Sequence, residues 1–275
     1  MLGLERCALL GRDSCWEILN SVVVNVVVVN PKGGSGKTTI ATNLAACYAT
    51  LALKVALVDK DPQGSSARWV AKRGESALHI HGVAAFQIPK NVTRSFATRI
   101  PPDMERVVTD TPAALTRNDL VEITHGADKV IVPVLPSDID IHAAARCIGD
   151  LLVAAKIPRS ENRLAVVANR VKRNTLMFRS LMRFLDSLRI PIVAVLRDSQ
   201  NYIRSAESGQ GLHEMRPPSL VRTDLSQWAH LVSWLEVGRV PPANLLWDRD
   251  EDADDDAPSP ISITPPAESS AHPSA

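Results

Sequence analysis

Short apolar runs recur along the chain and are separated by polar, Gly-rich or Pro-rich stretches. Most of these runs are apolar at nearly every position rather than at every second position. Such runs are typical of strands in a parallel sheet that is buried on both faces. The predicted strands are VVVNVVVVN (22–30), KVALVD (54–59), LHIHGV (78–83), MERVVTD (104–110), DKVIVPV (128–134), RLAVVANR (163–170) and IPIVAVL (190–196).

Segments with helical spacing lie between these runs. In residues 38–53, Ile40, Leu44, Tyr48 and Leu51 recur at intervals that place them on one helix face. The alternation of strands and helices predicts the α/β class, with a doubly wound, mostly parallel sheet flanked by helices. Further helices are predicted within 62–74, at 91–100, at 137–156 with Ser137 as N-cap, at 175–188, at 200–209 and at 220–237.

The composition changes abruptly after Trp247. Residues 248–275 carry eight acidic residues and one basic residue, a net charge of −7, and are otherwise rich in Pro, Ser and Ala. We predict a disordered tail that either keeps the chain soluble or acts as a charge-based regulator or docking segment. Residues 1–20 form a weakly patterned extension. Three interpretations of it remain: an additional helix, a disordered arm, or an artefact of where the start of translation was assigned. The predicted domain spans residues 21–240.

Charge is unevenly distributed along the chain. The total is +1, so the residues before the tail carry +8. A basic body favours contact with a polyanion such as DNA. The four cysteines, Cys7, Cys15, Cys47 and Cys147, lack metal-ligand or CxxC spacing, which predicts a reduced cytoplasmic protein in which Cys47 is a small buried apolar residue. No apolar run is long enough to span a bilayer, and no convincing signal peptide is found.

One Gly-rich stretch, NPKGGSGKTT (30–39), joins a predicted strand to a predicted helix. This position is typical of the phosphate-binding loop of P-loop NTPases, because backbone N–H groups and the helix N-terminus surround an anion there. We expect Lys37 to reach the β- and γ-phosphates and Thr38 to ligate Mg²⁺. The loop departs from the standard form at Pro31, where a glycine is usual, and at Lys32, a second lysine. The glycines expected to approach phosphate are Gly33, Gly34 and Gly36.

Three aspartates follow predicted strands. Asp110 ends the strand 104–110 and is the carboxylate that a Mg²⁺ site beside the loop requires. Asp59 and Asp61 follow the strand 54–59, where one of them can orient a water molecule for in-line attack on a γ-phosphate.

These elements together resemble the ParA/MinD family of deviant Walker A ATPases. The resemblance covers residues 22–237, approximately. Within the family, the chain looks most like the short ParF-type partition ATPases and related cargo-positioning ATPases, such as the carboxysome-positioning McdA proteins. The motifs that carry it are KGGSGKTT, VDKDPQGSS, VVTDTPAAL, VIVPVLPSDIDIHAA, VVANR and VLRDSQNYIRSAESG.

The resemblance implies a role for each motif residue. Lys37 would contact the ATP of its own subunit, and Lys32 would reach across a dimer interface to the partner's ATP. Asp61 would position the attacking water. The metal site would consist of Thr38 as Mg²⁺ ligand, Asp110 in the outer coordination sphere and Asp59 in support. Other nucleotide contacts would come from Gly33, Gly34, Ser35, Gly36 and Thr39, and from Asn169 and Arg170 near adenine.

The resemblance also implies partners: an ATP-dependent homodimer with slow intrinsic hydrolysis, non-specific DNA, and a ParB-like protein or cargo adaptor that stimulates turnover. Such a protein segregates or spaces a plasmid, a chromosome region or an assembly such as a carboxysome, in the bacterial cytoplasm and on the nucleoid. Candidate DNA contacts are Lys172, Arg173, Arg179, Arg183, Arg197, Arg204, Arg216 and Arg222.

Two other functions are weighed against this one. A MinD-like membrane-associated site-selection ATPase needs a basic amphipathic helix, but the last predicted helix is nearly devoid of basic residues and is followed by aspartates. We expect that helix to pack in the core through Trp228, Leu231, Val232 and Leu235, with no membrane contact. A metabolic enzyme on the same fold is also disfavoured. An iron–sulfur reductase needs cysteines at suitable spacing, which this chain lacks, and ATP-dependent ligases generally lack the D-x-D-P-Q and late R-D segments found here.

Overall fold

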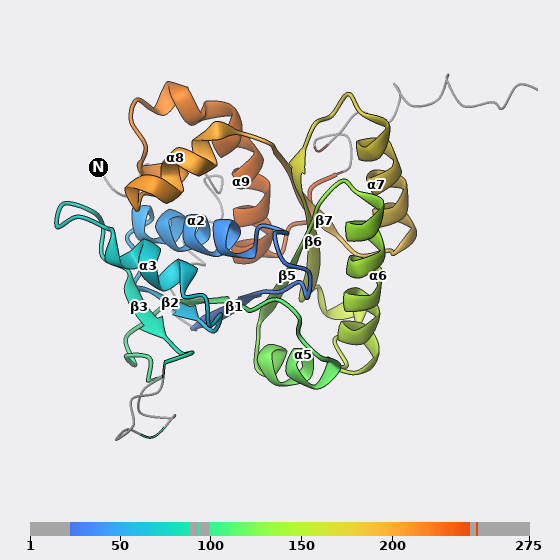
Figure 1. The fold of residues 1–275 in the computed structure, drawn as a ribbon, viewed down its shortest axis with the longest axis horizontal. Helices are drawn as coiled ribbons and strands as arrows, with labels where there is room; N and C mark the ends of the chain where they lie inside the picture. The colour runs from blue at the N-terminus through green and yellow to red at the C-terminus, as the bar shows by residue number, and fades with distance from the viewer. Residues whose placement is uncertain (1–22, 88–92, 94–98, 243–245, 247–275) are drawn as a thin grey trace, which may run out of the picture.

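The structure is a computed structural model and describes residues 23–87, 93, 99–242 and 246 (Figure 1). In this part of the chain one sheet of seven strands has the order β3-β2-β4-β1-β5-β6-β7, and every pairing is parallel. The predicted doubly wound parallel sheet is therefore confirmed. The strands are β1 (Val24–Val28), β2 (Val55–Asp59), β3 (His81–Ala84), β4 (Arg106–Asp110), β5 (Lys129–Val134), β6 (Leu164–Val171) and β7 (Ile192–Arg197).

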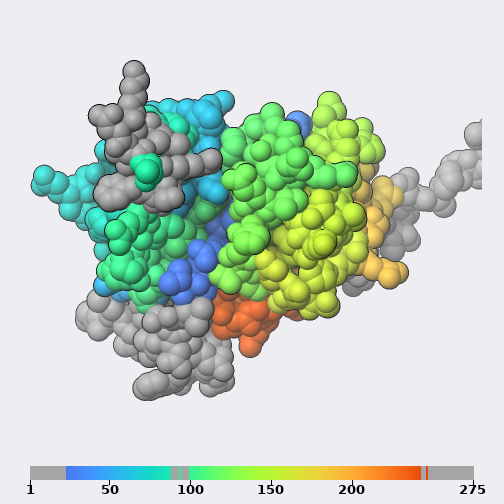
Figure 2. All heavy atoms as spheres, turned by 90° about the horizontal axis from the view of Figure 1, so that it is seen from below, coloured from blue at the N-terminus to red at the C-terminus, as the bar shows by residue number. Residues whose placement is uncertain are grey.

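Helices cover both faces of the sheet, and each face has its own apolar core. Residues of α2, α3 and α9 form one core, and residues of α5, α6 and α7 form the other. Figure 2 shows the second face, where the green and yellow-green parts of the chain lie side by side. The helices are α2 (Lys37–Thr50), α3 (Ser65–Ala71), α5 (Arg117–Thr124), α6 (Asp138–Val153), α7 (Leu176–Ser187), α8 (Gln200–Ser208) and α9 (Arg222–Val237), with short 3₁₀ helices η3 (Arg159–Glu161), η4 (Leu212–Glu214) and η5 (Pro218–Val221).

The valine run of β1 illustrates why the strands are continuously apolar. Successive side chains of a strand point to opposite faces. Val26 and Val28 accordingly lie in the core with α2 and α9, whereas Val27 and Val29 lie in the core with α6 and α7. Because both faces are covered by helices, residues 26–29 are apolar at every position, and the one polar residue of β1, Asn25, lies near the start of the strand, where it is only half-buried.

Most predicted elements occur, with some differences. The strand predicted at 78–83 is shorter and shifted, at His81–Ala84. Sequence reasoning missed α5, which begins with a capping box between Thr116 and Asp119. The predicted Ser137 cap of α6 is confirmed, since its side chain accepts from the Asp140 N–H. Most of the predicted helix 91–100 lies outside the described residues, as do residues 1–20 and 248–275.

The last helix packs inside the molecule, as predicted. Trp228, Leu231, Val232 and Leu235 of α9 are all buried in the core shared with α2. Among the described residues, no helix has the length and the apolar character that crossing a membrane requires.

Candidate nucleotide-binding site

The Gly-rich loop, residues 30–39, is packed tightly against the end of β6. Gly36 has φ of +94°, in the left-handed region that favours glycine, and a Cβ there would lie 2.1 Å from the Asn169 Nδ2 atom. The same Nδ2 donates a hydrogen bond to the Ser35 carbonyl oxygen at 2.9 Å. Glycine is therefore the residue that allows the loop to approach the sheet at this point. We refer to residues 30–39 as the cradle.

Asn30 fixes the start of the cradle. Its Nδ2 donates to the Pro133 carbonyl of β5 at 2.8 Å, and its Oδ1 accepts from the Lys32 N–H at 2.9 Å. Within the cradle, α2 begins at Lys37 without a side-chain cap, so the N–H groups of its first turn are left for another acceptor. An uncapped helix N-terminus behind a Gly-rich loop is a binding site for phosphate.

The two lysines of the cradle have different partners. Lys37 is buried, and its Nζ donates to the Lys32 carbonyl oxygen at 3.1 Å. Burial lowers the pKa of the Lys37 ammonium, and the nearby carboxylates of Asp110 and Asp61 oppose this shift. Lys32 instead pairs with a carboxylate of α6, with 2.7 Å between its Nζ and the Asp140 Oδ1. The Lys32 side chain is 32% exposed and that of Lys37 is buried, so the two ammonium groups are held by different parts of the molecule.

The parallel register brings the predicted aspartates together. Asp110 of β4 lies opposite both Val28 of β1 and Asp59 of β2, so three strand ends meet beside the cradle. Asp110 is fully buried; its Oδ2 accepts from the Ser66 hydroxyl at 2.8 Å, and its Oδ1 has no hydrogen-bond partner among the described residues.

Burial raises the pKa of Asp110 to about 6. The hydroxyls of Ser66 and Thr38 and the Lys37 ammonium lower this pKa, whereas the Asp59 carboxylate raises it. A buried carboxylate with an unpartnered oxygen beside a threonine hydroxyl fits a Mg²⁺ site, because a divalent cation would stabilise the charged form. The roles that the resemblance implies, Thr38 as a direct ligand and Asp110 in the outer coordination sphere, stay predictions.

Asp59 and Asp61 shape the segment that leads to α3. Asp59 is buried and uses both carboxylate oxygens, accepting from the Asp61 N–H at 3.0 Å and from the Ala67 N–H at 2.8 Å. Asp61 is only half-buried, and one of its oxygens accepts from the Gln63 N–H at 2.9 Å. Of the two, Asp61 is the more exposed, and its predicted role in orienting water stays a prediction. Asp59 positions Asp61 through the backbone.

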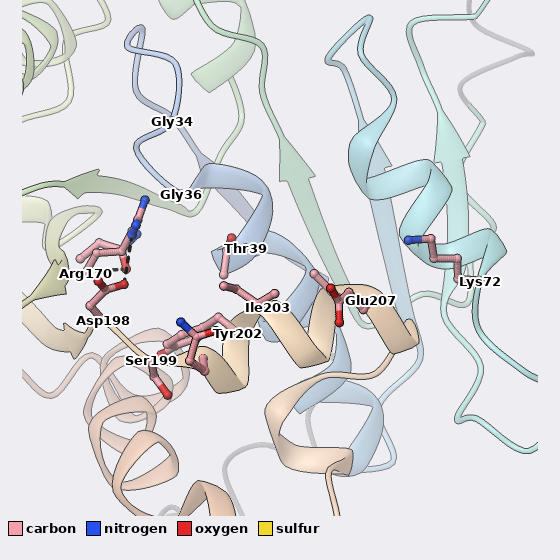
Figure 3. A pocket seen from close by; sticks show the side chains of 13 residues that line it. Gly34, Gly36, Thr39, Lys72, Arg170, Asp198, Ser199, Tyr202, Ile203 and Glu207 are labelled. Atoms are coloured by element: carbon pink, nitrogen blue, oxygen red, sulfur yellow. Dashed lines mark hydrogen bonds and ion pairs between the residues drawn. The ribbon is translucent and has the colours of Figure 1, made fainter.

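A cavity of about 560 Å³ opens beside the cradle (Figure 3). Gly34, Gly36 and Thr39 line it on one side, and the predicted base contacts Asn169 and Arg170 lie at the end of β6. Its far wall is the segment from the end of β7 into α8, which sequence reasoning noted only as a family-like segment. The lining residues of that segment include Asp198, Ser199, Gln200, Tyr202 and Ile203.

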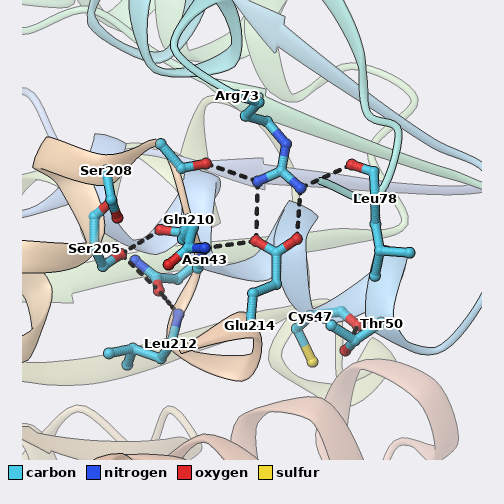
Figure 4. Close-up of polar contacts among 12 residues, drawn as sticks. Asn43, Cys47, Thr50, Arg73, Leu78, Ser205, Ser208, Gln210, Leu212 and Glu214 are labelled. Carbon is cyan, nitrogen blue, oxygen red and sulfur yellow. Dashed lines mark hydrogen bonds and ion pairs between the residues drawn. The ribbon is translucent and has the colours of Figure 1, made fainter. Parts of the chain in front are cut away.

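A polar network connects α2, the end of α3 and the segment that follows α8 (Figure 4). Arg73, just after α3, makes two hydrogen bonds to Glu214 of η4, at 2.9 and 2.6 Å, and one to the Gly209 carbonyl at 2.9 Å. Asn43 of α2 accepts from the Leu212 N–H at 2.9 Å. The network joins α2, α3 and α8 and was not predicted, because its members are far apart in the sequence.

Only some of the predicted DNA contacts lie together. Lys172, Arg173 and Arg197 line a second cavity, also of about 560 Å³, between the ends of β6 and β7 and α9. We call this the basic groove. Arg197 is engaged there by the buried Asp224, with its Nε 2.6 Å and its Nη2 3.1 Å from the carboxylate oxygens. The other candidates, Arg179, Arg183, Arg204, Arg216 and Arg222, do not line this groove.

Both described cysteines are buried and free. Burial raises the pKa of the Cys47 thiol above its usual range and that of Cys147 to about 12. Cys47 is thus a small apolar core residue, as predicted. Cys7 and Cys15 lie outside the described residues.

Comparison with known proteins agrees with this geometry. A family model described as the CobQ/CobB/MinD/ParA nucleotide binding domain matches residues 26–212, more than half of the chain. The carboxysome distribution protein A of Halothiobacillus neapolitanus is 29% identical over 171 residues, which are 61% of this chain and 76% of that protein. The protein of the same description from Gloeobacter kilaueensis is 40% identical over 118 residues, 42% of this chain and 51% of that protein.

Among solved structures, apo McdA from Cyanothece superposes with a TM-score of 0.59, covering 76% of this chain and all of that chain. Its sequence identity is 17%, so this likeness supports the fold alone. The family model covers the cradle, the three aspartates and the end of β6, which are the parts that form the site. The chain therefore belongs to the CobQ/CobB/MinD/ParA family of nucleotide-binding proteins.

Proposed function

We propose that this chain is a positioning ATPase: it forms an ATP-dependent sandwich dimer, binds DNA without sequence preference, and segregates or spaces a cargo. The observation that carries the proposal is the different placement of the two cradle lysines. Lys37 lies inside the cradle, where it can meet the phosphates of a nucleotide bound to its own subunit. The Lys32 side chain is instead partly exposed, and its ammonium pairs with Asp140 of α6. A partly exposed lysine beside a phosphate site suits contact with a second subunit.

Hydrolysis would use groups that already converge. The glycine N–H groups and the first turn of α2 would bind the phosphates, and Lys37 would exchange the Lys32 carbonyl for a phosphate oxygen. Thr38 would hold Mg²⁺, with Asp110 behind it; bound Mg²⁺ would neutralise charge on the phosphates. Asp61 would orient water for in-line attack on the γ-phosphate. We expect turnover of the isolated protein to be slow, well below the roughly 10 s⁻¹ of a typical enzyme.

Dimer formation would replace one ion pair by another. In the single chain the Lys32 ammonium is paired with Asp140. Moving to the partner's ATP gives it the higher charge of a triphosphate, and loss of the γ-phosphate removes part of that gain. The dimer would thus form with ATP and separate after hydrolysis, a population shift driven by differential contacts.

The cargo and partner are proposed from relatives and from charge. Two relatives are described as maintaining carboxysome distribution. The residues before the tail carry a net charge of +8, which favours the nucleoid as a surface in the bacterial cytoplasm. A ParB-like protein or a cargo adaptor would stimulate hydrolysis.

The test is Lys32→Ala, studied by light scattering on a gel-filtration column with and without ATP and Mg²⁺. We expect the wild type to shift from monomer to dimer with ATP, and the variant to bind ATP yet stay monomeric. Lys172→Ala is the matched control, because it removes a lysine that lies away from the cradle, and it should dimerise normally. Normal ATP-dependent dimerisation of Lys32→Ala would refute the role of Lys32 between subunits.

A further inference from the structure

Among the residues that the structure describes, the basic groove is lined by cations and by no acidic residue. Besides Lys172, Arg173 and Arg197, its walls consist of apolar residues, three polar residues of α9 and His230. Partial burial lowers the pKa of His230, so this ring is neutral near pH 7. Because Arg197 is paired with the buried Asp224, the charge left for a ligand comes from Lys172 and Arg173.

Lys172 and Arg173 are exposed, and no carboxylate of the described residues pairs with either. Arg173 nevertheless has one fixed contact, since its Nη2 donates to the Leu246 carbonyl oxygen at 3.0 Å. A guanidinium has five N–H donors, so one that donates a single hydrogen bond to a carbonyl oxygen can still bind an anion through the others.

Leu246, close before the acidic tail in the sequence, lies at this groove. Its side chain is 3% exposed and belongs to the core with α6 and α7, so the chain is anchored there. The following residues are WDRDEDADDD, with seven acidic residues between 248 and 256. One intervening residue joins Leu246 to Asp248, and one residue of chain spans at most about 3.6 Å. The most acidic segment of the chain is therefore tethered next to two cations that have no carboxylate partner in the described residues.

We propose that the acidic segment 248–256 binds the basic groove of its own chain, at Lys172 and Arg173, and competes there with DNA phosphates. The segment is favoured over an external polyanion because it is tethered at the groove, with an effective concentration on the order of millimolar. Its contact with the groove stands by itself, whereas the competition rests on the proposed DNA binding. The tail then lowers DNA affinity, and any partner or modification that removes it raises that affinity.

The test uses the full chain with a neutral tail and a labelled peptide of residues 247–257. The neutral-tail variant combines Asp248→Asn, Asp250→Asn, Glu251→Gln, Asp252→Asn, Asp254→Asn, Asp255→Asn and Asp256→Asn. In fluorescence anisotropy, we expect the peptide to bind this variant at least tenfold more tightly than the wild type, whose own tail fills the groove. Adding Lys172→Ala and Arg173→Ala to the neutral-tail variant should abolish peptide binding. The matched control is Arg146→Ala, which removes an exposed arginine of α6 and should leave peptide binding unchanged.

Duplex DNA is then added with ATP. The neutral-tail variant should bind DNA roughly tenfold more tightly than the wild type at low salt, with a smaller difference at high salt, and DNA should displace the peptide. Equal peptide binding by wild type and neutral-tail variant, or binding that ignores the groove substitutions, would overturn the proposal. If the peptide binds the groove but no variant binds DNA, the tail contact stands and the proposed DNA binding fails.

Discussion

The cradle and the basic groove are both built to meet negative charge, yet they are built differently. In the cradle, Lys37 is buried, its ammonium is already hydrogen-bonded, and Asn30 and Asn169 hold the backbone around it. In the groove, Lys172 and Arg173 are exposed. One site is fixed before its ligand arrives, and the other offers charge without a fixed shape.

This difference determines what each site can recognise. A fixed, partly desolvated cradle distinguishes a compact polyphosphate by geometry, and its contacts are little affected by salt. Exposed cations attract any extended polyanion, and their affinity falls steeply as salt rises. Substitutions in the two regions should therefore differ both in the size of their effect and in its salt dependence.

The largest effect is expected from Lys37→Ala. Removing the buried ammonium leaves the γ-phosphate of ATP without its charged partner, which costs about 3–5 kcal/mol, or roughly several hundredfold or more in affinity. Titration calorimetry with a slowly hydrolysed ATP analogue measures this loss. Lys172→Ala, in the groove, should bind the analogue like the wild type. Similar affinity for both variants would mean that Lys37 is not the phosphate ligand.

The second prediction concerns how Asp110, beside the cradle, makes the free energy of unfolding depend on pH. Burial raises the pKa of Asp110 from 3.8 to about 6, so between these pH values the folded chain holds a proton that the unfolded chain has released. The protonated Asp110 therefore stabilises the folded chain fully below about pH 4, and this stabilisation is lost as the pH rises through about 6. The resulting change in the free energy of unfolding is about 3 kcal/mol.

Urea unfolding without nucleotide or metal measures this effect when wild type and Asp110→Asn are compared from pH 4 to 7. The stability of the wild type relative to the variant should fall across this range. Mg²⁺ with nucleotide should restore part of the difference by stabilising the charged carboxylate. A constant difference between the two proteins would show that Asp110 does not titrate in this window.

The sequence predicted the site best where the functional residues belong to short, continuous motifs. The cradle, Asp59, Asp61 and Asp110 follow strands whose apolar runs are unmistakable, and parallel pairing brings those strand ends together. The far wall of the cavity and the Arg73–Glu214 pair were beyond sequence reasoning, because residues over a hundred positions apart meet there only after folding. Helix α5 was missed because it is short and only two of its residues are buried, so its apolar periodicity is weak.

The smallest effect, and the one that separates the two regions most clearly, is expected in the groove. Lys172→Ala combined with Arg173→Ala should weaken binding of duplex DNA in the presence of ATP by roughly tenfold at low salt. The slope of log affinity against log salt should become shallower by about 1.8, since each lost phosphate contact contributes about 0.9. Affinity for the ATP analogue should not change. Fluorescence anisotropy at several salt concentrations gives the slope, with Arg146→Ala as the control for removing a cation elsewhere. An unchanged slope would place DNA on another face of the molecule, and the groove would then be left to the acidic tail alone.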